Sequence, residues 1–128
     1  HDLCVRALLE AGADVEKQST LGYTALMLAA KNGHDLCARA LIEAKANLEA
    51  VKTRGYTALL IAASNGHVLC ARALIEAKAN LEAVDTRGYT ALMIAAEQGH
   101  DLCAQELLNA VSDIQLLKSC FRVQLPPP

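Results

Sequence analysis

The chain has 128 residues, of which 53% are hydrophobic and 20% are charged, and its formal net charge is −2. This length and apolar content suit one folded domain and exclude a disordered chain, and the near-neutral charge argues against a general nucleic-acid binder. No apolar run approaches the roughly 18 residues that span a bilayer, so no membrane insertion is expected. Aromatic residues make up only 3%. A core of Ala, Leu and Ile is therefore expected, which is typical of closely packed helices.

The chain repeats itself with a period of 33 residues. This spacing separates His1, His34, His67 and His100; Cys4, Cys37, Cys70 and Cys103; and Tyr23, Tyr56 and Tyr89. We therefore divide the chain into a partial repeat at 1–16 that holds only a second helix, full repeats at 17–49, 50–82 and 83–115, and a C-terminal segment at 116–128. The partial repeat lacks a polar capping face, so we expect further repeats before it in the parent protein.

The first full repeat predicts a helix over residues 25–32. Thr24 can cap this helix with its hydroxyl group, and the residues after it are mostly good helix formers. Gly33 follows at a place where a residue without Cβ ends a helix in the left-handed conformation. Asp35 then puts a negative charge in the first turn of a second helix, where the helix dipole favours it.

The spacing in the second helix predicts one buried stripe and one charged face. The expected buried stripe consists of Leu36, Cys37, Ala40 and Leu41. Arg39 and Glu43 are expected to pair on the opposite face, four residues apart. Residues 47–55 alternate loosely and end in Thr-Arg-Gly, which predicts an extended turn or hairpin before the next repeat.

Two motifs, whose positions other than Asp85 recur in register, carry a resemblance to a known family. They are Asp85-x-x-Gly88-x-Thr90-x-Leu92 and Ala95-Ala96-x-x-Gly99-His100, together with a Leu-Leu or Leu-Ile pair near the end of each second helix. Over about residues 1–115 the chain resembles the ankyrin repeat, a unit of a hairpin turn and two antiparallel helices. The resemblance implies an all-α ankyrin-repeat solenoid, with helix pairs joined by β-hairpin-like turns.

The chain departs from this family where a glycine usually follows the second helix. Lys45, Lys78 and Val111 stand at that position. A left-handed backbone there costs a lysine about 1 kcal/mol and a β-branched valine more. We therefore expect Val111 to break the pattern and the last repeat to close differently. For the C-terminal segment two alternatives remain: a short helix over 114–121 that covers the last repeat, or an extended tail.

The periodic cysteines and histidines do not predict a metal or catalytic site. Equivalent residues on neighbouring repeats lie about 8–10 Å apart, whereas ligands of one zinc ion lie within about 4 Å of each other. The periodic cysteines fall on the apolar stripe and are expected to be buried free thiols, which indicates a reducing compartment and a cytoplasmic location. The resemblance makes His34, His67 and His100 structural, bonded to the backbone in the loop. No catalytic residue, cofactor or metal ligand is predicted, and the chain is not expected to be an enzyme.

The resemblance implies instead a concave groove, lined by the turns and the first helices, that binds another protein. The implied positions are Thr20, Leu21, Tyr23, Lys31 and Asn32 in the first full repeat; Thr53, Arg54, Tyr56, Ser64 and Asn65 in the second; and Thr86, Arg87, Tyr89, Glu97 and Gln98 in the third. We therefore predict a monomeric, non-catalytic protein–protein interaction scaffold. The alternative is a regulatory or targeting segment of a larger enzyme, channel or ubiquitin-ligase adaptor.

Overall fold

A computed structural model describes residues 17–111, so the expectations for 1–16 and 112–128 lie outside the described residues. The described helices are α2 (Ala25–Asn32), α3 (Asp35–Glu43), α4 (Ala58–Asn65), α5 (Val68–Glu76), α6 (Ala91–Glu97) and a last helix whose described part is 101–111, with one 3-10 turn, η1 (Thr53–Gly55). Between residues 17 and 111 there is no β strand. The predicted all-α architecture is therefore confirmed.

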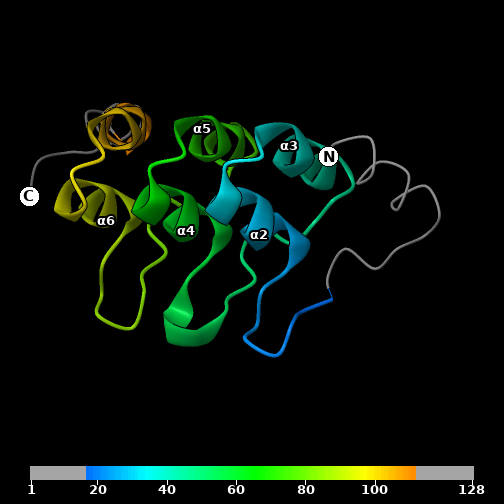
Figure 1. The fold of residues 1–128 in the computed structure, drawn as a ribbon. Coiled ribbons are helices and arrows are strands. Elements are labelled where there is room, and N and C mark those ends of the chain that lie inside the picture. The colour runs from blue at the N-terminus through cyan, green and yellow to red at the C-terminus, as the bar shows by residue number, and fades with distance from the viewer. Residues whose placement is uncertain (1–16, 112–128) are drawn as a thin grey trace, which may run out of the picture.

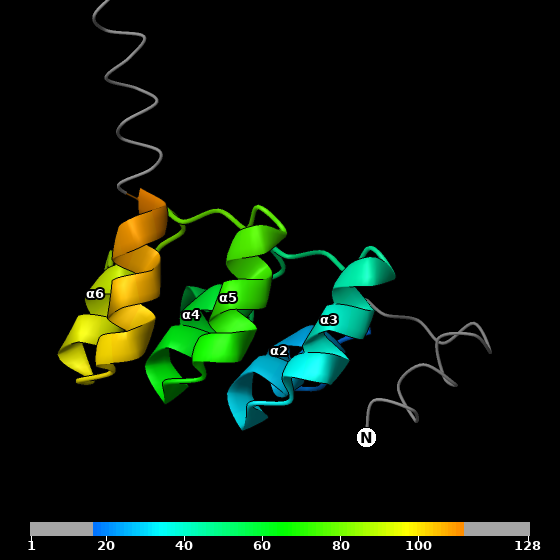
Figure 2. The ribbon, with the colours of Figure 1, turned by 90° about the horizontal axis from the view of Figure 1, so that it is seen from above.

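The helices form two parallel rows. The first helices of the repeats, α2, α4 and α6, lie side by side, and α3, α5 and the helix at 101–111 form the second row (Figure 1). Each first helix packs against the second helix of its own repeat, so that three helix pairs stand next to one another (Figure 2). The long connections between repeats extend from the first row, away from the second (Figure 1). Each repeat therefore contacts mainly its neighbours in sequence, as in a solenoid.

Threonine caps begin the first helices as the sequence predicts. The hydroxyl oxygens of Thr24, Thr57 and Thr90 each accept a hydrogen bond at 3.3 Å from the backbone N–H three residues later. All three threonines have extended backbones. The first two of these helices end at Gly33 and Gly66, which are left-handed with φ of 76° and 73°. Local sequence signals thus determine where each first helix begins and ends.

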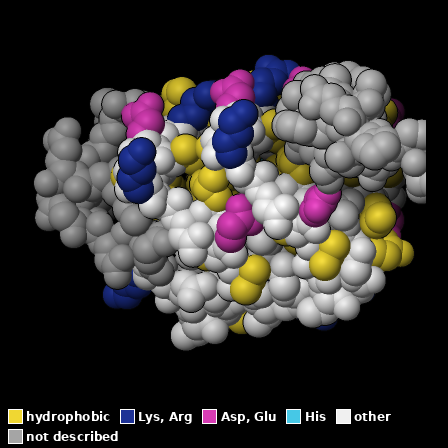
Figure 3. Space-filling view, turned by 180° about the vertical axis from the view of Figure 1, so that it is seen from behind, with side chains coloured by type: hydrophobic (Ala, Val, Ile, Leu, Met, Phe, Trp, Pro, Cys, Tyr) yellow, Lys and Arg dark blue, Asp and Glu magenta, His cyan; other side chains and the backbone are white. Residues whose placement is uncertain are grey.

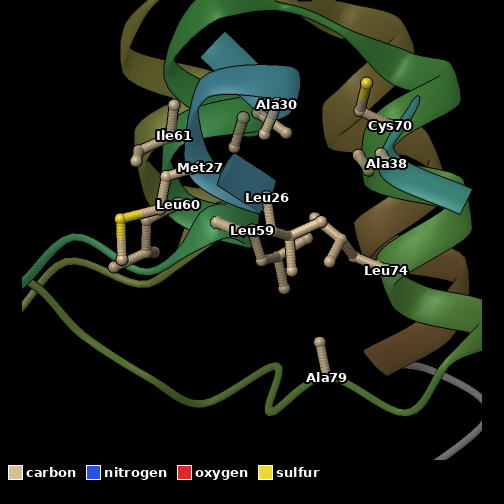
Figure 4. Packing of buried hydrophobic residues seen from close by; sticks show 14 of the residues in the cluster. Leu26, Met27, Ala30, Ala38, Leu59, Leu60, Ile61, Cys70, Leu74 and Ala79 are labelled. Atoms are coloured by element: carbon tan, nitrogen blue, oxygen red, sulfur yellow. The ribbon is translucent and has the colours of Figure 1, made fainter. Parts of the chain in front are cut away.

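The core lies between the two rows and is built from alanines around a few leucines. Leu26 and Leu59 from the first row and Leu74 from α5 converge at its centre, each at most 2% exposed (Figure 4). Alanines on both rows, such as Ala30 and Ala38, are fully buried. Because an alanine side chain is a single methyl group, these helices approach closely, which explains the aliphatic composition.

The predicted buried stripe of α3 is wrong at Leu36, whose side chain is 58% exposed. The buried residues of α3 are Cys37, Ala38, Ala40 and Leu41. At 3.6 residues per turn, Leu36 points about 120° away from the centre of that face, whereas Ala38 lies within it. Ala38 is closed off by the neighbouring repeat, which packs α5 against α3. The same position is exposed in the next two repeats, at Leu69 and Leu102.

The two lysines that replace the usual glycine do adopt the left-handed conformation. The backbone φ is 68° at Lys45 and 69° at Lys78. Val111, at the equivalent place, is helical instead, so the last helix continues past the point at which α3 and α5 have ended. The expected break of the pattern is confirmed, because a β-branched side chain strongly disfavours the left-handed region.

We predict that Lys78→Gly raises the free energy of unfolding by about 1 kcal/mol, because glycine adopts this backbone without a Cβ penalty. Urea denaturation followed by circular dichroism measures the change. The neighbouring Ala77 supplies a matched control, since its φ is −81°. Ala77→Gly is expected to lower the free energy of unfolding by about 0.5–1 kcal/mol. A loss of stability in both variants would contradict a strained backbone at Lys78.

Candidate functional site

The connections between repeats end in narrow turns, each followed by a tyrosine. In the three turns the N–H groups of Ser19, Lys52 and Asp85 donate to the carbonyl oxygens of Tyr23, Tyr56 and Tyr89, respectively, at 2.9–3.1 Å. These are the hairpin-like turns that the sequence predicts, although they extend into no strand within residues 17–111. All three tyrosines are half-buried and pack against the hydrophobic core. Each ring is therefore held at the junction of a turn and a first helix.

A pocket of about 170 Å³ opens between the first and second full repeats. Its lining comes from two successive turns and first helices: Tyr23, Lys31, Lys52, Tyr56, Ile61, Ser64 and Asn65. Lys31 is at the end of α2, and Ser64 and Asn65 are at the end of α4. We call this cavity the lysine–tyrosine pocket. Its walls carry ammonium, phenol, hydroxyl and amide groups, all of which can donate hydrogen bonds.

Cation–π contacts hold both lysines of the lysine–tyrosine pocket over aromatic rings. The Lys52 ammonium lies 5.0 Å from the Tyr23 ring centroid and 4.8 Å from that of Tyr56. The Lys31 ammonium also lies 5.0 Å from the Tyr23 centroid. Each contact is worth about 0.5–1 kcal/mol at an accessible site. The contacts therefore restrain two long side chains toward one place.

The third repeat carries a different set of charges at its tyrosine. The Arg87 guanidinium lies 4.2 Å from the Tyr89 ring centroid and forms ion pairs with Asp85 at 3.0 Å and Glu97 at 3.4 Å. Burial favours the neutral form of Asp85, but hydrogen bonds from the Tyr89 N–H and from Arg87 outweigh it and hold the pKa of this carboxyl below its usual value. This cation is thus neutralised within its own repeat.

The structure leaves every sequence-predicted groove residue at least partly accessible. It brings five of them together in the lysine–tyrosine pocket: Tyr23, Lys31, Tyr56, Ser64 and Asn65. Arg87, Tyr89 and Glu97 meet in the third repeat, where the Gln98 amide also donates to Glu97 at 3.5 Å. The remaining predicted residues do not line the pocket: Thr20, Leu21, Asn32, Thr53, Arg54 and Thr86.

Three residues of this surface are not among the predicted contact positions: Lys52 and Ile61, which line the pocket, and Asp85. Lys52 and Asp85 are equivalent to Ser19, so one position of the repeat is Ser, Lys and Asp in turn. The residues that follow, Thr-Arg-Gly-Tyr-Thr, are identical in the second and third repeats. A change of charge beside an unchanged segment was the signal that could have identified this position.

The periodic histidines join neighbouring repeats. The Nε2 atom of His67 lies 3.0 Å from the carbonyl oxygen of Lys31, and that of His100 lies 3.0 Å from the carbonyl oxygen of Ser64. Because a carbonyl only accepts, the ring N–H donates in both contacts. The structural role predicted for these two residues is confirmed, but the bonds reach the end of the preceding repeat's first helix rather than the residues' own loop.

The cysteines of the described residues are buried free thiols, as predicted. Cys37, Cys70 and Cys103 are 7%, 0% and 1% exposed. Burial, reinforced by nearby Asp35, raises the pKa of the Cys70 thiol to about 11, so this side chain stays protonated and unreactive near neutral pH. Within residues 17–111, no three His, Cys, Asp or Glu side chains gather as they would to hold a metal ion.

Ion pairs on the second row connect repeats rather than residues of one helix. The prediction that Arg39 pairs with Glu43 is wrong. Arg39 forms an ion pair at 3.3 Å with Glu76, which is equivalent to Glu43 one repeat later. Arg72 contacts Glu106 at 2.7 Å, because Asn109 stands where the next copy of that glutamate would be. Figure 3 shows basic and acidic side chains close together along this upper edge of the molecule. On the second row, Arg39 and Arg72 are thus each paired with a glutamate of the following repeat.

Comparison with known proteins agrees with this architecture. A family model described as ankyrin repeats in three copies matches residues 1–85 and residues 44–118. No curated protein matches the chain. None of the helices in residues 17–111 combines the length and the apolar character that crossing a membrane requires. Ankyrin repeat domains generally act as non-catalytic protein-interaction modules. Because the family model covers nearly the whole chain and the helix pairs recur every 33 residues, this protein belongs to the ankyrin repeat family.

Proposed function

We propose that this chain is a protein–protein interaction scaffold that binds its partner along the turns and first helices. The observation that supports this most is the lysine–tyrosine pocket, since it unites side chains from two repeats on one accessible surface. Tyrosine is enriched among the residues that dominate binding energy at protein interfaces, because it offers a large rigid surface and a polar end.

Two basic side chains of the second row are already engaged in ion pairs. These are the Arg39–Glu76 and Arg72–Glu106 pairs, which join neighbouring repeats. The first row, by contrast, presents three half-buried tyrosines with cations above their rings. Because the helix rows are packed through a continuous core, the partner would dock on a rigid surface with little change of shape.

The test compares partner recovery on two variants of the 128-residue chain used as bait in quantitative affinity purification. Tyr56→Ala/Tyr89→Ala is expected to reduce recovery of the bound partner at least about tenfold, because central aromatic side chains carry much of the binding energy. Circular dichroism and thermal denaturation of the same variant establish that it remains folded.

Leu69→Ala/Leu102→Ala is the matched control. It also removes two large side chains, but these lie exposed on the second row. Recovery with this control is expected to equal that of the wild-type chain. Equal recovery with the tyrosine variant and the wild-type chain would refute the proposed binding surface. A loss confined to the leucine variant would place the binding surface on the second row instead.

A further inference from the structure

The lysine–tyrosine pocket has an excess of positive charge that the described chain does not neutralise. Lys31 and Lys52 line it, and within residues 17–111 neither ammonium forms an ion pair with a carboxylate. Both ammonium groups lie 5.0 Å from the Tyr23 ring centroid, so they are separated by at most twice that distance, about 10 Å. That is comparable to the Debye length at 0.1 M salt, so the two charges repel each other.

The third repeat pairs its cation with a carboxylate of the same repeat, although Arg87 is equivalent to Arg54 and not to Lys52. Its cation, Arg87, also lies over a tyrosine ring, and the Glu97 carboxylate reaches it from the end of α6 at 3.4 Å. Ser64 occupies the position equivalent to Glu97 one repeat earlier and lines the pocket without a carboxylate. The same fold position therefore holds an acidic group in one repeat and leaves room for one in the other.

We infer that the lysine–tyrosine pocket binds a carboxylate side chain, Asp or Glu, from an acidic segment of the partner protein. The carboxylate lies between the Lys31 and Lys52 ammonium groups, beside Ser64. The Ser64 hydroxyl and the Tyr56 phenol lie in the same lining and can donate further hydrogen bonds. This inference rests on the proposed function, because the pocket is part of the surface proposed to bind the partner.

The distribution of charge also determines over which repeats the acidic part of the bound segment lies. The pocket between the first and second full repeats carries two cations that form no ion pair within residues 17–111, whereas Asp85 and Glu97 outnumber Arg87 at the third. An acidic residue is therefore attracted to the first site and repelled from the second. The acidic end of the segment lies over α2 and α4 rather than over α6.

Binding of a hexaglutamate peptide to the full 128-residue chain tests the inference. Fluorescence anisotropy at low ionic strength is expected to show saturable binding of labelled hexaglutamate and none of hexaglutamine. Lys31→Gln/Lys52→Gln is expected to weaken this binding at least about tenfold, since it removes both charges that face the carboxylate. Ser64→Glu is expected to weaken it similarly, because its own carboxylate would occupy the pocket, while Ser64→Gln is expected to have a smaller effect.

Lys45→Gln/Lys78→Gln is the matched control. It changes the net charge by the same amount, but these exposed lysines lie in the turns after α3 and α5 and do not line the pocket. Its affinity for hexaglutamate is expected to equal that of the wild-type chain. An equal loss in both double variants would show diffuse attraction and overturn the inference. Wild-type affinity in Ser64→Glu would also overturn it.

Three further outcomes separate this inference from its alternatives. Displacement of hexaglutamate by millimolar phosphate, but not by chloride at equal ionic strength, would assign the pocket to phosphate and overturn the carboxylate assignment. If Tyr56→Ala/Tyr89→Ala abolishes partner recovery while hexaglutamate does not bind, the inference fails and the proposed function stands. If the tyrosine variant recovers its partner fully, the proposed function fails, whatever the peptide result.

Discussion

Leu74→Ala is expected to lower the free energy of unfolding by about 3 kcal/mol. Replacing a buried leucine by alanine typically costs about 2–5 kcal/mol, depending on how well the site can close around the cavity. The Leu74 side chain is fully buried and meets Leu26 and Leu59 between the two helix rows (Figure 4). The surrounding alanines have no side-chain freedom with which to fill the cavity. Because this cluster joins successive repeats, the loss weakens the interface as well as α5 itself. Urea denaturation followed by circular dichroism measures it.

Leu69→Ala provides the control on the same helix. Leu69 is 48% exposed, so the same substitution there is expected to change the free energy of unfolding by less than about 1 kcal/mol. The comparison holds the helix, the residue type and the change constant and varies only burial. Similar losses at both positions would contradict the packing described for α5.

Gly66→Ala is expected to lower the free energy of unfolding by about 2–3 kcal/mol, for two reasons. The backbone of Gly66 is left-handed, with φ of 73°, which alone costs an alanine about 1 kcal/mol. In addition, a Cβ at this position would lie 2.6 Å from the Nδ1 atom of the His100 ring. The ring must then shift, which strains its hydrogen bond to the carbonyl oxygen of Ser64.

Gly99→Ala separates these two contributions. Gly99 has a φ of 74°, but nothing among residues 17–111 lies within 4 Å of a Cβ built there. Its expected loss is therefore the backbone cost alone, about 1 kcal/mol. A double-mutant cycle of Gly66→Ala with His100→Ala is expected to show a coupling energy of at least about 0.5 kcal/mol. Equal losses for the two glycine variants, with no coupling, would show that the histidine does not lock neighbouring repeats together.

Local signals in the sequence were sufficient for most of the fold. The period is visible in the sequence itself. The threonine caps and the glycines that end α2 and α4 depend on contacts within a few residues, so the local sequence determines them. The outcome at Val111 was predictable for the same reason, because the left-handed conformation of a β-branched residue is costly wherever it occurs. The buried thiols followed from periodicity alone, since small apolar residues recur on the packed face.

The candidate site was only partly predictable. The family resemblance placed Tyr23, Lys31 and Tyr56 on one surface, and the structure brings them into one pocket. The contact between Lys52 and Tyr23 was not predictable, because these residues are 29 positions apart in the chain and their proximity depends on how two turns lie beside each other. A pattern confined to one repeat carries no information on that distance.

The sequence by itself determined the all-α repeat architecture, the starts of the first helices and the accessibility of the residues proposed to bind a partner. The tertiary structure alone decided how repeats meet: the exposure of Leu36, the pairing of Arg39 with Glu76, the histidine bonds to the preceding repeat, and the two lysines brought to one tyrosine ring. The last three share one physical reason. Each depends on the lateral placement of neighbouring helix pairs, and contacts between residues about 30 positions apart are set by packing of the whole core rather than by local conformational preference.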